Sequence, residues 1–556
     1  MKRLLLLGWA VMMACCTGAL HAQTLRWASQ GDPQTMDPHS QNETLTNSIN
    51  GQIYEKLVKR DRELNLVPGL ATEWTQVSSL LWRLKLRPGV KFQDGAPFTA
   101  DDVVFSVNRA KGPTSQLSNY ANSVGTPRAV DALTVEFALA AVNPIFLQHL
   151  DTLFIMSKSW CEANNVTRPL DFKNKEESFA SRNANGTGPY QVVTRQPGIK
   201  TVFKRNPAWW GWPVSPPTAG TRSAPSTSIG GAVALASGPA SNDGNVQEMV
   251  FTPIGNDATR LAALVSGEID FVLDPAPRDV GRLRKTEGVK VIDGPENRLI
   301  FIAMDQARDT LLYGRVPNGK NPFKDVRVRR ALYQAIDIET IKIKLMNGLS
   351  APTGGLTPSP VGSFNDAALE ARLLPFDVAA ARKLMAEAGY ADGFEVTLDC
   401  PNNRYINDEK ICQALAVMWA QLKVKLRVNP MPRVTYFPKL EKLDTSLNLY
   451  GWGGAITDAE VILTPVFRNR GEKGVGAYNY GGVRNDKFDA LAAQSSIEAD
   501  AKKREVLIKA ALAEYKHQVH VIPLHRQMIP WAARSTVNVV HRADNWLELS
   551  WVSIDR

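Results

Sequence analysis

The feature that most constrains the fold is a repeated order of strand, helix and strand. Residues 250–253 have the pattern of a strand, Asp257 caps a helix with one apolar face, and this helix stops at Gly267. Residues 269–273 then form an apolar run of the length of a buried strand. The same order recurs over residues 394–428. This succession favours a partly parallel sheet, so we predict an α/β fold with mixed sheets.

The N-terminus has the pattern of a targeting segment. A basic start precedes an apolar run over residues 4–16, which is too short for a stop-transfer helix, and a cleavage site ends at Ala22. We therefore expect a cleaved signal peptide at residues 1–22 and export to the periplasm. Lipid attachment at Cys15 or Cys16 is the alternative, which the residues before Cys15 disfavour.

The rest of the chain is too large for one domain. It contains 534 of the 556 residues, whereas single hydrophobic cores stop growing at about 250–300 residues. The formal net charge of +10 is spread along the chain, without an arginine-rich tract or interleaved basic and aromatic residues. This pattern argues against a nucleic-acid partner.

Two segments have distinctive local patterns. Residues 81–92 alternate apolar and polar side chains around Pro88-Gly89, which predicts a β-hairpin. Residues 212–245 are rich in Pro, Gly, Ser, Ala and Thr and lack the periodicity of either regular element. We expect them to form a surface insertion of the disordered type.

Three cysteines follow the expected signal peptide: Cys161, Cys400 and Cys412. A disulfide can form in an exported protein, and the pair Cys400–Cys412, which closes a short loop, is favoured. Cys161 would then be a buried thiol. Three reduced thiols are the alternative. Because the chain has no Cys-x-x-Cys spacing here, a structural zinc site is not indicated.

Several motif-like segments do not support catalysis or metal binding. Residues 314–320 have the spacing of a phosphate-binding loop, but Asn321 stands where a Ser or Thr is needed. His517, His520 and His525 could contribute to a metal site, yet a predicted helix ends between the first two. The sequence contains neither Gly-x-Ser-x-Gly nor His-Glu-x-x-His. We therefore predict no catalytic residue, no bound metal and no cofactor.

Trp452 ends a predicted strand and is followed by Gly453 and Gly454. Glycines let the backbone approach a ligand closely, and an aromatic ring beside exposed amides can hold a small polar molecule in a cleft. The alternative is that Trp452 belongs to the hydrophobic core.

Longer segments are distinctive in combination. The most specific one, residues 66–111, contains "LVPGLATEWT" and "WRLKLRPGVKFQDGAPFTADDVVFSVNRAK". Others are "GTGPYQV" at 186–192, "DATRLAALVSGEIDFV" at 257–272, "DVRVRRALYQAID" at 325–337 and "YNYGGVRNDKFDAL" at 478–491. Over nearly the whole chain, these segments resemble the family 5 extracellular solute-binding proteins, the peptide and nickel receptors of ABC importers.

The resemblance implies a two-lobed periplasmic binding protein, class II-like with an extra domain, whose lobes close on the ligand about a hinge. Two crossover strands would join the lobes, near residues 299–305 and 520–525. The expected ranges are 23–50, 186–297 and 520–556 for lobe I, 51–185 for the extra domain, and 298–519 for lobe II.

The resemblance also implies a ligand site. In dipeptide-binding relatives an arginine in the loop after a strand binds the ligand carboxylate, and the matching segment "CPNNRYINDE" makes Arg404 the candidate. The Cys400–Cys412 bridge would brace this loop. The predicted ligand-binding residues are Ser29, Gln30, Asn402, Arg404, Tyr405, Trp452, Gly453, Gly454, Ala455 and Asp458.

One position departs from these relatives. They carry an aspartate three residues after the tryptophan of a "GW" strand end, where it pairs with the ligand's ammonium group. Here Ala455 occupies that place, and Asp458 lies three residues further on. Because an unpaired buried ammonium is costly, a peptide with a free amine is disfavoured.

The resemblance therefore predicts a monomeric substrate-binding component of an ABC importer. It would capture a small carboxylate-bearing ligand, peptide-like or another organic acid, and deliver it to the permease subunits in the inner membrane. Two alternatives remain: a nickel or metal-chelate receptor of the same family, and a periplasmic hydrolase on the same fold.

Overall fold

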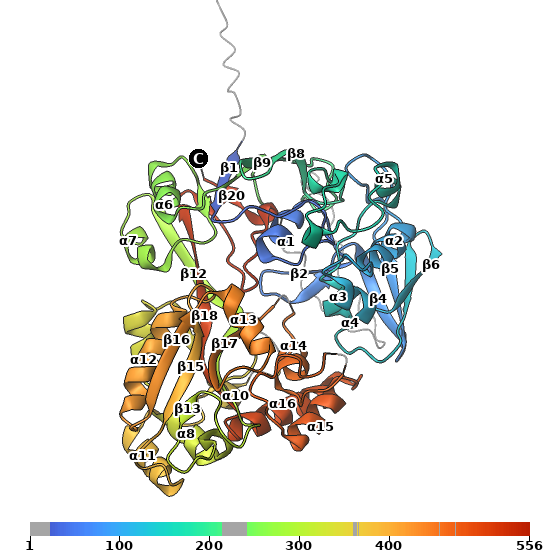
Figure 1. The fold of residues 1–556 in the computed structure, drawn as a ribbon. Coiled ribbons are helices and arrows are strands. Elements are labelled where there is room, and N and C mark those ends of the chain that lie inside the picture. Colours follow the sequence, from blue (N-terminus) through green and yellow to red (C-terminus); the bar gives the residue numbers. More distant parts are fainter. Residues whose placement is uncertain are drawn as a thin grey trace, which may run out of the picture.

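The computed structural model describes residues 23–213, 242–359, 364, 366–454, 456–472 and 474–555. The expected signal peptide, most of the expected insertion and Ala455 lie outside the described residues. The described chain is a mixed α/β protein with several sheets, as predicted. Figure 1 shows lobe I at the upper left, the extra domain at the right and lobe II below.

One large sheet continues through both lobes. Its hydrogen-bonded order is β13 (Gly314–Arg315), β15 (Glu395–Pro401), β17 (Leu447–Gly453), β12 (Val289–Met304), β18 (Val521–Arg534), β11 (Phe271–Val272), β1 (Thr24–Ser29), β10 (Glu248–Pro253), β9 (Lys200–Arg205) and β8 (Tyr190–Gln196). In addition, β14 (Ser350–Pro352) pairs with β18, and β16 (Lys425–Met431) with β15. Parallel pairs such as β1 with β10 and antiparallel pairs such as β12 with β17 make the sheet mixed.

The long strands β12 and β18 connect the lobes. They pair antiparallel, and their register shifts between Pro295 and Leu299 of β12. The apolar run that predicted a strand at residues 299–304 is the second half of β12. Its two faces enter different cores, one with Ile300 and the other with Phe301, which explains why the run does not alternate with polar residues.

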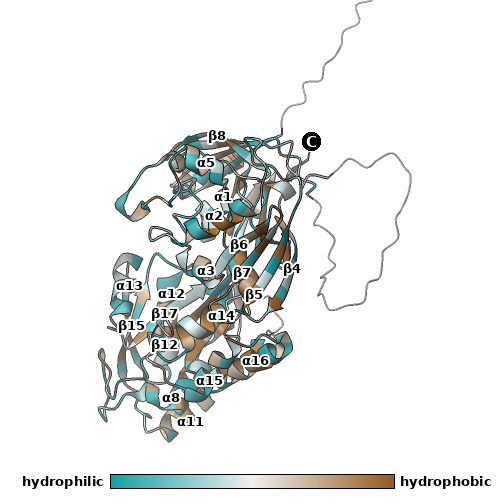
Figure 2. Ribbon diagram, turned by 90° about the vertical axis from the view of Figure 1, so that its right-hand side faces the viewer, coloured by the Kyte–Doolittle hydropathy of each residue, from teal (hydrophilic) through white to brown (hydrophobic). Residues whose placement is uncertain are grey.

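Helices cover both faces of the sheet in lobe II. One core contains residues of α8 (Val326–Gln334), α11 (Val378–Glu387) and α12 (Asp408–Ala420), and the other contains residues of α13 (Arg433–Glu441), α15 (Asp486–Ser495) and α16 (Ala501–His517). Short helices are α9 (Ile338–Thr340), α10 (Ala367–Glu370) and α14 (Glu460–Ile462). Figure 2 shows hydrophilic colour on α8 and α15, which lie on the outside of this layered arrangement.

Lobe I packs helices on the first strands of the sheet. Its helices are α1 (Thr44–Asn50), α6 (Asp257–Ser266) and α7 (Val280–Leu283). Trp27 of β1 lies in a core with α1, whereas Ala28 faces α6 and α7 in a smaller core. A ribbon of β19 (Val537–Asn538) and β20 (Ser553–Ile554) lies near the C-terminus.

The extra domain has its own antiparallel sheet. The strand order is β4 (Ala71–Ser78), β5 (Leu81–Leu86), β7 (Thr134–Ala138) and β6 (Thr126–Asp131), and β2 (Val58–Arg60) pairs separately with β3 (Leu66–Pro68). Its helices are α2 (Ala100–Ala110), α3 (Ser118–Ser123), α4 (Phe146–Leu150) and α5 (Lys158–Ala163).

The hairpin predicted over residues 81–92 is wrong. β5 pairs with β4 and β7, and the segment after Gly89 makes only a bridge between Lys91 and Pro97. The alternating pattern identified β5 but not its partner, because the apolar face of β5 joins the core of a sheet rather than a local ribbon.

Candidate functional site

The hinge lies where β12 leaves lobe I. At this point the Asn297 N–H donates to the carbonyl of Ala543 in lobe I (2.8 Å), and the Asn297 carbonyl accepts from the N–H of Gly454 in lobe II (3.3 Å). The next residue, Arg298, pairs with Gly453 at the end of β17. Side chains on this short segment therefore lie at the junction of the two lobes, where closure would enclose a ligand.

The loop that carries Arg404 reaches this junction. It connects β15 to α12, and the Asp408 carboxylate accepts hydrogen bonds from the N–H groups of Arg404 (2.9 Å) and Tyr405 (3.0 Å). A disulfide joins Cys400 to Cys412 across the same loop, and Cys161 is a buried free thiol. The loop is therefore held in one shape by a carboxylate and a covalent bridge.

Tyr405 fixes the loop to β17. Its hydroxyl accepts from the Gly451 N–H (2.9 Å) and donates to the Gly451 carbonyl (3.1 Å). Gly451 must be small here, because a Cβ would come within 2.6 Å of the tyrosine ring. Tyr405 is buried and its hydroxyl is occupied, so its part in a ligand site is to support the Arg404 guanidinium, which lies 5.1 Å from the ring centroid.

The guanidinium of Arg404 is partly buried and makes no hydrogen bond or ion pair with the described residues. Burial lowers the pKa of Arg404, and the charge of the neighbouring Arg298 lowers it further. Arg298 donates from Nε to Glu296 (3.1 Å), and the other oxygen of Glu296 accepts from Gln527 of β18 (2.7 Å). One carboxylate thus lies near two arginines. We call Glu296, Arg298 and Arg404 the hinge cluster, and its excess positive charge can accept an anion.

The sequence reasoning missed Arg298. Its signal was a charged pair, Glu296 and Arg298, directly before an apolar strand at a predicted crossover. The pairing of Arg298 with Gly453, which brings it to the Arg404 loop, comes only from the three-dimensional structure.

Trp452 stands beside this cluster on β17. Its indole N–H donates to the Val461 carbonyl (2.6 Å), and its ring lies 4.7 Å from the Tyr478 ring by centroid distance. Because Trp452 is only partly buried, it packs on a core and still offers surface. Gly453 has no room for a Cβ, which would lie 2.1 Å from the Asn297 carbonyl, whereas Gly454 is exposed and a Cβ there would meet the Val461 side chain at an ordinary contact distance of 3.8 Å. Of the two glycines, Gly454 is the one that a ligand could approach.

Comparisons with known proteins agree with this arrangement. Residues 65–474 match the model of the bacterial extracellular solute-binding proteins, family 5, middle region. The chain belongs to this family. The glutathione-binding protein GsiB of Escherichia coli O1:K1 is 25% identical over 511 residues, covering 90% of this chain and 88% of that protein.

Solved structures show the same fold. The ABC transporter substrate-binding protein CtaP from Listeria monocytogenes has a TM-score of 0.77 at 22% identity, covering 96% of this chain and 100% of that one. The periplasmic binding protein DppA from Helicobacter pylori, in complex with the peptide STSA, has a TM-score of 0.67 at 20% identity, covering 96% and 98%. This family 5 protein is therefore an extracellular solute-binding protein.

One predicted residue of the family 5 protein, Asp458, already has a partner. Asp458 is buried and both its oxygens accept from Arg504 (2.7 Å each), so its carboxylate is occupied. The adjacent Thr457 contacts the other side of the cleft: its N–H donates to Gln148 (3.0 Å), and its hydroxyl accepts from Arg60 (3.1 Å). The loop after β17 therefore bridges lobe II and the extra domain.

Three further predicted residues have hydrogen-bond partners of their own. Ser29 and Gln30, at the end of β1, both donate to Asp274 (2.9 and 3.0 Å), and burial raises the pKa of this carboxyl. Asn402 is exposed and its N–H donates to the Met431 carbonyl (3.1 Å). The structure thus brings together Arg404, Tyr405 and the end of β17, but gives Ser29, Gln30 and Asn402 separate partners.

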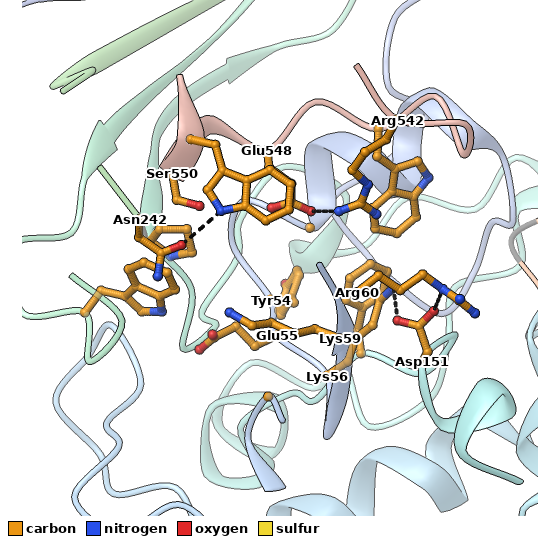
Figure 3. Close-up of a pocket in the computed structure, with 17 residues that line it drawn as sticks. Tyr54, Glu55, Lys56, Lys59, Arg60, Asp151, Asn242, Arg542, Glu548 and Ser550 are labelled. Atoms are coloured by element: carbon orange, nitrogen blue, oxygen red, sulfur yellow. Dashed lines mark hydrogen bonds and ion pairs between the residues drawn. The ribbon is translucent and has the colours of Figure 1, made fainter. Parts of the chain in front are cut away.

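A small cavity between lobe I and the extra domain is the site in Figure 3. Its volume is about 60 Å³, which is room for a few water molecules. Several of its charges are paired: Asp151 accepts from Arg60 (2.6 Å) and Lys56 (3.4 Å), and Glu548 from Arg542 (3.3 Å). Glu55 accepts from the Trp210 indole (2.8 Å), and Lys59 lies over the rings of Trp209 and Trp210. Because the cavity is small and several of its charges are already paired, it is a weaker candidate than the hinge cluster.

A wider cavity of about 440 Å³ separates the extra domain from lobe II. Residues 140–145 and His149 line one side, and Glu460 and Arg504 line the other. This volume lies in the range of small-molecule sites, about 300–1,000 Å³. None of the residues that line it belongs to the hinge cluster of Glu296, Arg298 and Arg404, so this cavity is a separate space from the one beside Arg404.

The structure offers no support for the metal and nucleotide alternatives. Within the described ranges, no group of three or more His, Cys, Asp or Glu side chains could hold a metal ion. His520 contacts Gln306 and Asn485, and His517 contacts Arg330. The loop of residues 314–320 leads into a short 3-10 helix rather than an α-helix. No helix of the described part is long and apolar enough to cross a membrane.

Proposed function

We propose that the mature protein is a periplasmic receptor that captures a small, peptide-like ligand through its carboxylate group and delivers it to the permease. The observation that carries this proposal is the Arg404 guanidinium, which is partly buried at the hinge and makes no hydrogen bond with the described residues. Guanidinium groups bind carboxylates in a bidentate manner, and a partly buried site strengthens such a bond.

The relatives support a ligand of this class. GsiB is named as a glutathione-binding protein, and the DppA structure contains a peptide. The occupied Asp458 argues against its pairing with a free ammonium group of a ligand, since its carboxylate already pairs with Arg504. We therefore infer that the ligand's amino end is blocked or is bound elsewhere.

Export and action as a monomer complete the proposal. Residues 1–22 have the pattern of a signal peptide, and family 5 binding proteins are periplasmic. The ligand would enter between the lobes, and movement about β12 and β18 would close them, giving the permease a closed form to bind.

Binding measurements test this proposal. By isothermal titration calorimetry, N-acetyl-Ala-Ala should bind, whereas its C-terminal amide should bind much more weakly, and unblocked Ala-Ala should bind more weakly than the acetylated form. Glutathione should be included because of the GsiB likeness. Mass spectrometry of the natively purified protein would identify any ligand that co-purifies.

Arg404→Ala should weaken the binding of N-acetyl-Ala-Ala by about 10- to 150-fold, the equivalent of one hydrogen-bonded charge. Arg427→Ala, an exposed arginine on β16 of the same lobe, is the matched control and should leave affinity unchanged. Equal affinities for acid and amide would refute the carboxylate assignment.

A further inference from the structure

We propose that Arg298 is a second ligand-binding residue, which forms with Arg404 a clamp for one carboxylate, and that Glu296 sets the charge of this clamp. This inference rests on the proposed carboxylate ligand and adds to it a residue on the hinge strand and a preference for one negative charge.

The first step is the hydrogen-bonding capacity of the two arginines. Arg298 uses its Nε–H on Glu296 (3.1 Å), and no hydrogen bond to a described residue involves its two Nη groups. The Arg404 guanidinium has no such bond at all. A guanidinium carries five N–H donors, so the clamp presents donors that the described protein does not satisfy.

The second step is position. Arg298 lies on β12 opposite Gly453, and Arg404 lies on the loop that Tyr405 fixes to Gly451, two residues earlier on the same strand. Both arginines are partly buried, with Arg298 having 16% of its side chain exposed. Both also act electrostatically on Tyr405, so the two positive groups share one neighbour. They approach the junction from the crossover strand and from lobe II.

The third step is the charge. Three partly buried groups set this charge: Arg298 and Arg404 carry two positive charges, and Glu296 supplies one negative charge. The charge of Arg433 also acts on Arg404, but Arg433 is exposed and solvent screens it. Glu296 is held in place because Gln527 of β18 donates to its second oxygen (2.7 Å). One positive charge is left over, and a single carboxylate neutralises it. In a partly buried site an unbalanced charge of either sign is unfavourable, so a second carboxylate would bring excess negative charge.

Variants of Arg298 test the clamp. Arg298→Met should weaken the binding of N-acetyl-Ala-Ala by about tenfold or more, as expected for a charged hydrogen bond, while the binding of the C-terminal amide should not change. A residue that only shaped the hinge would affect acid and amide equally. Arg427→Met on β16 is the control for loss of an arginine, and circular dichroism should show that each variant is folded.

Glu296→Gln tests the charge balance, because Gln has the same shape, keeps one of the two acceptor oxygens and removes the charge; the other oxygen becomes an NH2 group. The native protein should prefer N-acetyl-Ala-Ala over the dianionic N-acetyl-Ala-Asp, and Glu296→Gln should shift this ratio at least tenfold toward the dianion. An unchanged ratio, or full affinity in Arg298→Met, would overturn the clamp. If Arg404→Ala weakens binding in that case, the proposed function stands alone; if acid and amide bind equally in the native protein, both fall.

Discussion

Two arginines, the buried Arg109 and the partly buried Arg404, differ in the hydrogen bonds that their guanidinium groups make. Arg109 of α2 has a side chain with no exposed surface, and it donates to both oxygens of Asp37 (2.8 and 2.7 Å) and to the carbonyls of Val166 (3.0 Å) and Arg168 (2.9 Å). Arg404 has no such partner for its guanidinium among the described residues. A saturated charge stabilises the fold, whereas an open one is available to a ligand.

Removing Arg109 should have the largest effect on stability. Burial would raise the pKa of Asp37, but Arg109 outweighs it and holds that pKa below its usual value, so the carboxylate depends on this partner. Arg109→Met should therefore lower the free energy of unfolding by about 3–5 kcal/mol, measured by urea denaturation. Ligand affinity of the folded fraction should not change.

Arg168→Met is the matched control. Arg168 pairs with Glu176, but 63% of its side chain is exposed, and exposed pairs contribute about 0–1 kcal/mol. Arg109→Met could also unfold at the same urea concentration as the native protein. In that case, the number of hydrogen bonds that an arginine makes would not tell a stabilising arginine from a ligand-binding one.

Glu460 adds a third case to the comparison, an ionisable group whose charge has no ion-pair partner from the described chain. One of its oxygens is buried without a hydrogen-bond partner in the described structure, and burial raises its pKa from 4.5 to about 7. Above pH 4.5 the unfolded chain ionises this group, while the folded protein keeps it protonated up to about pH 7. The stability that the neutral carboxyl contributes is thus complete below pH 4.5 and is lost as the pH rises through 7.

Glu460→Gln should remove this dependence. At pH 8 the variant should be more stable than the native protein by about 2–3 kcal/mol, and at pH 4 the two should be equal, as measured by urea denaturation at both pH values. The nearby Asp458→Asn variant should behave differently: it breaks the ion pair with Arg504 and should lose stability at pH 8. A constant difference between pH 4 and pH 8 for Glu460→Gln would contradict the raised pKa.

Local sequence patterns predicted where strands occur better than they predicted which strands pair with each other. The strand predicted at residues 250–253 lies within β10 (Glu248–Pro253), but β12 begins at Val289, ten residues before the crossover strand predicted near residue 299. Gly294, Pro295 and several charged residues hide that first half from any apolar pattern. It forms a strand because β18 supplies the hydrogen bonds, which is a long-range effect.

In the candidate site, too, contacts between residues far apart in the sequence could not be predicted. Arg404 was found because a family resemblance marks its loop, and the reason for its openness, the lack of a nearby free carboxylate, is visible only in three dimensions. Arg298 meets it through pairing with Gly453, which lies far away in the sequence. Asp458 looked free in the sequence, because its partner Arg504 lies 46 residues later on α16.

The smallest and sharpest effect should come from Arg404 itself. Burial lowers the pKa of Arg404, and Arg298 lowers it further, which means that the ligand-free protein holds this charge at a cost. Arg404→Met, which keeps the contact with the Tyr405 ring and removes the charge, should therefore raise the free energy of unfolding of the ligand-free protein by about 1 kcal/mol. Arg427→Met should leave it unchanged. Loss of binding together with a gain in stability would identify Arg404 as a charge kept for the ligand; a loss of stability approaching that of Arg109→Met would instead make both arginines structural and remove the distinction between them.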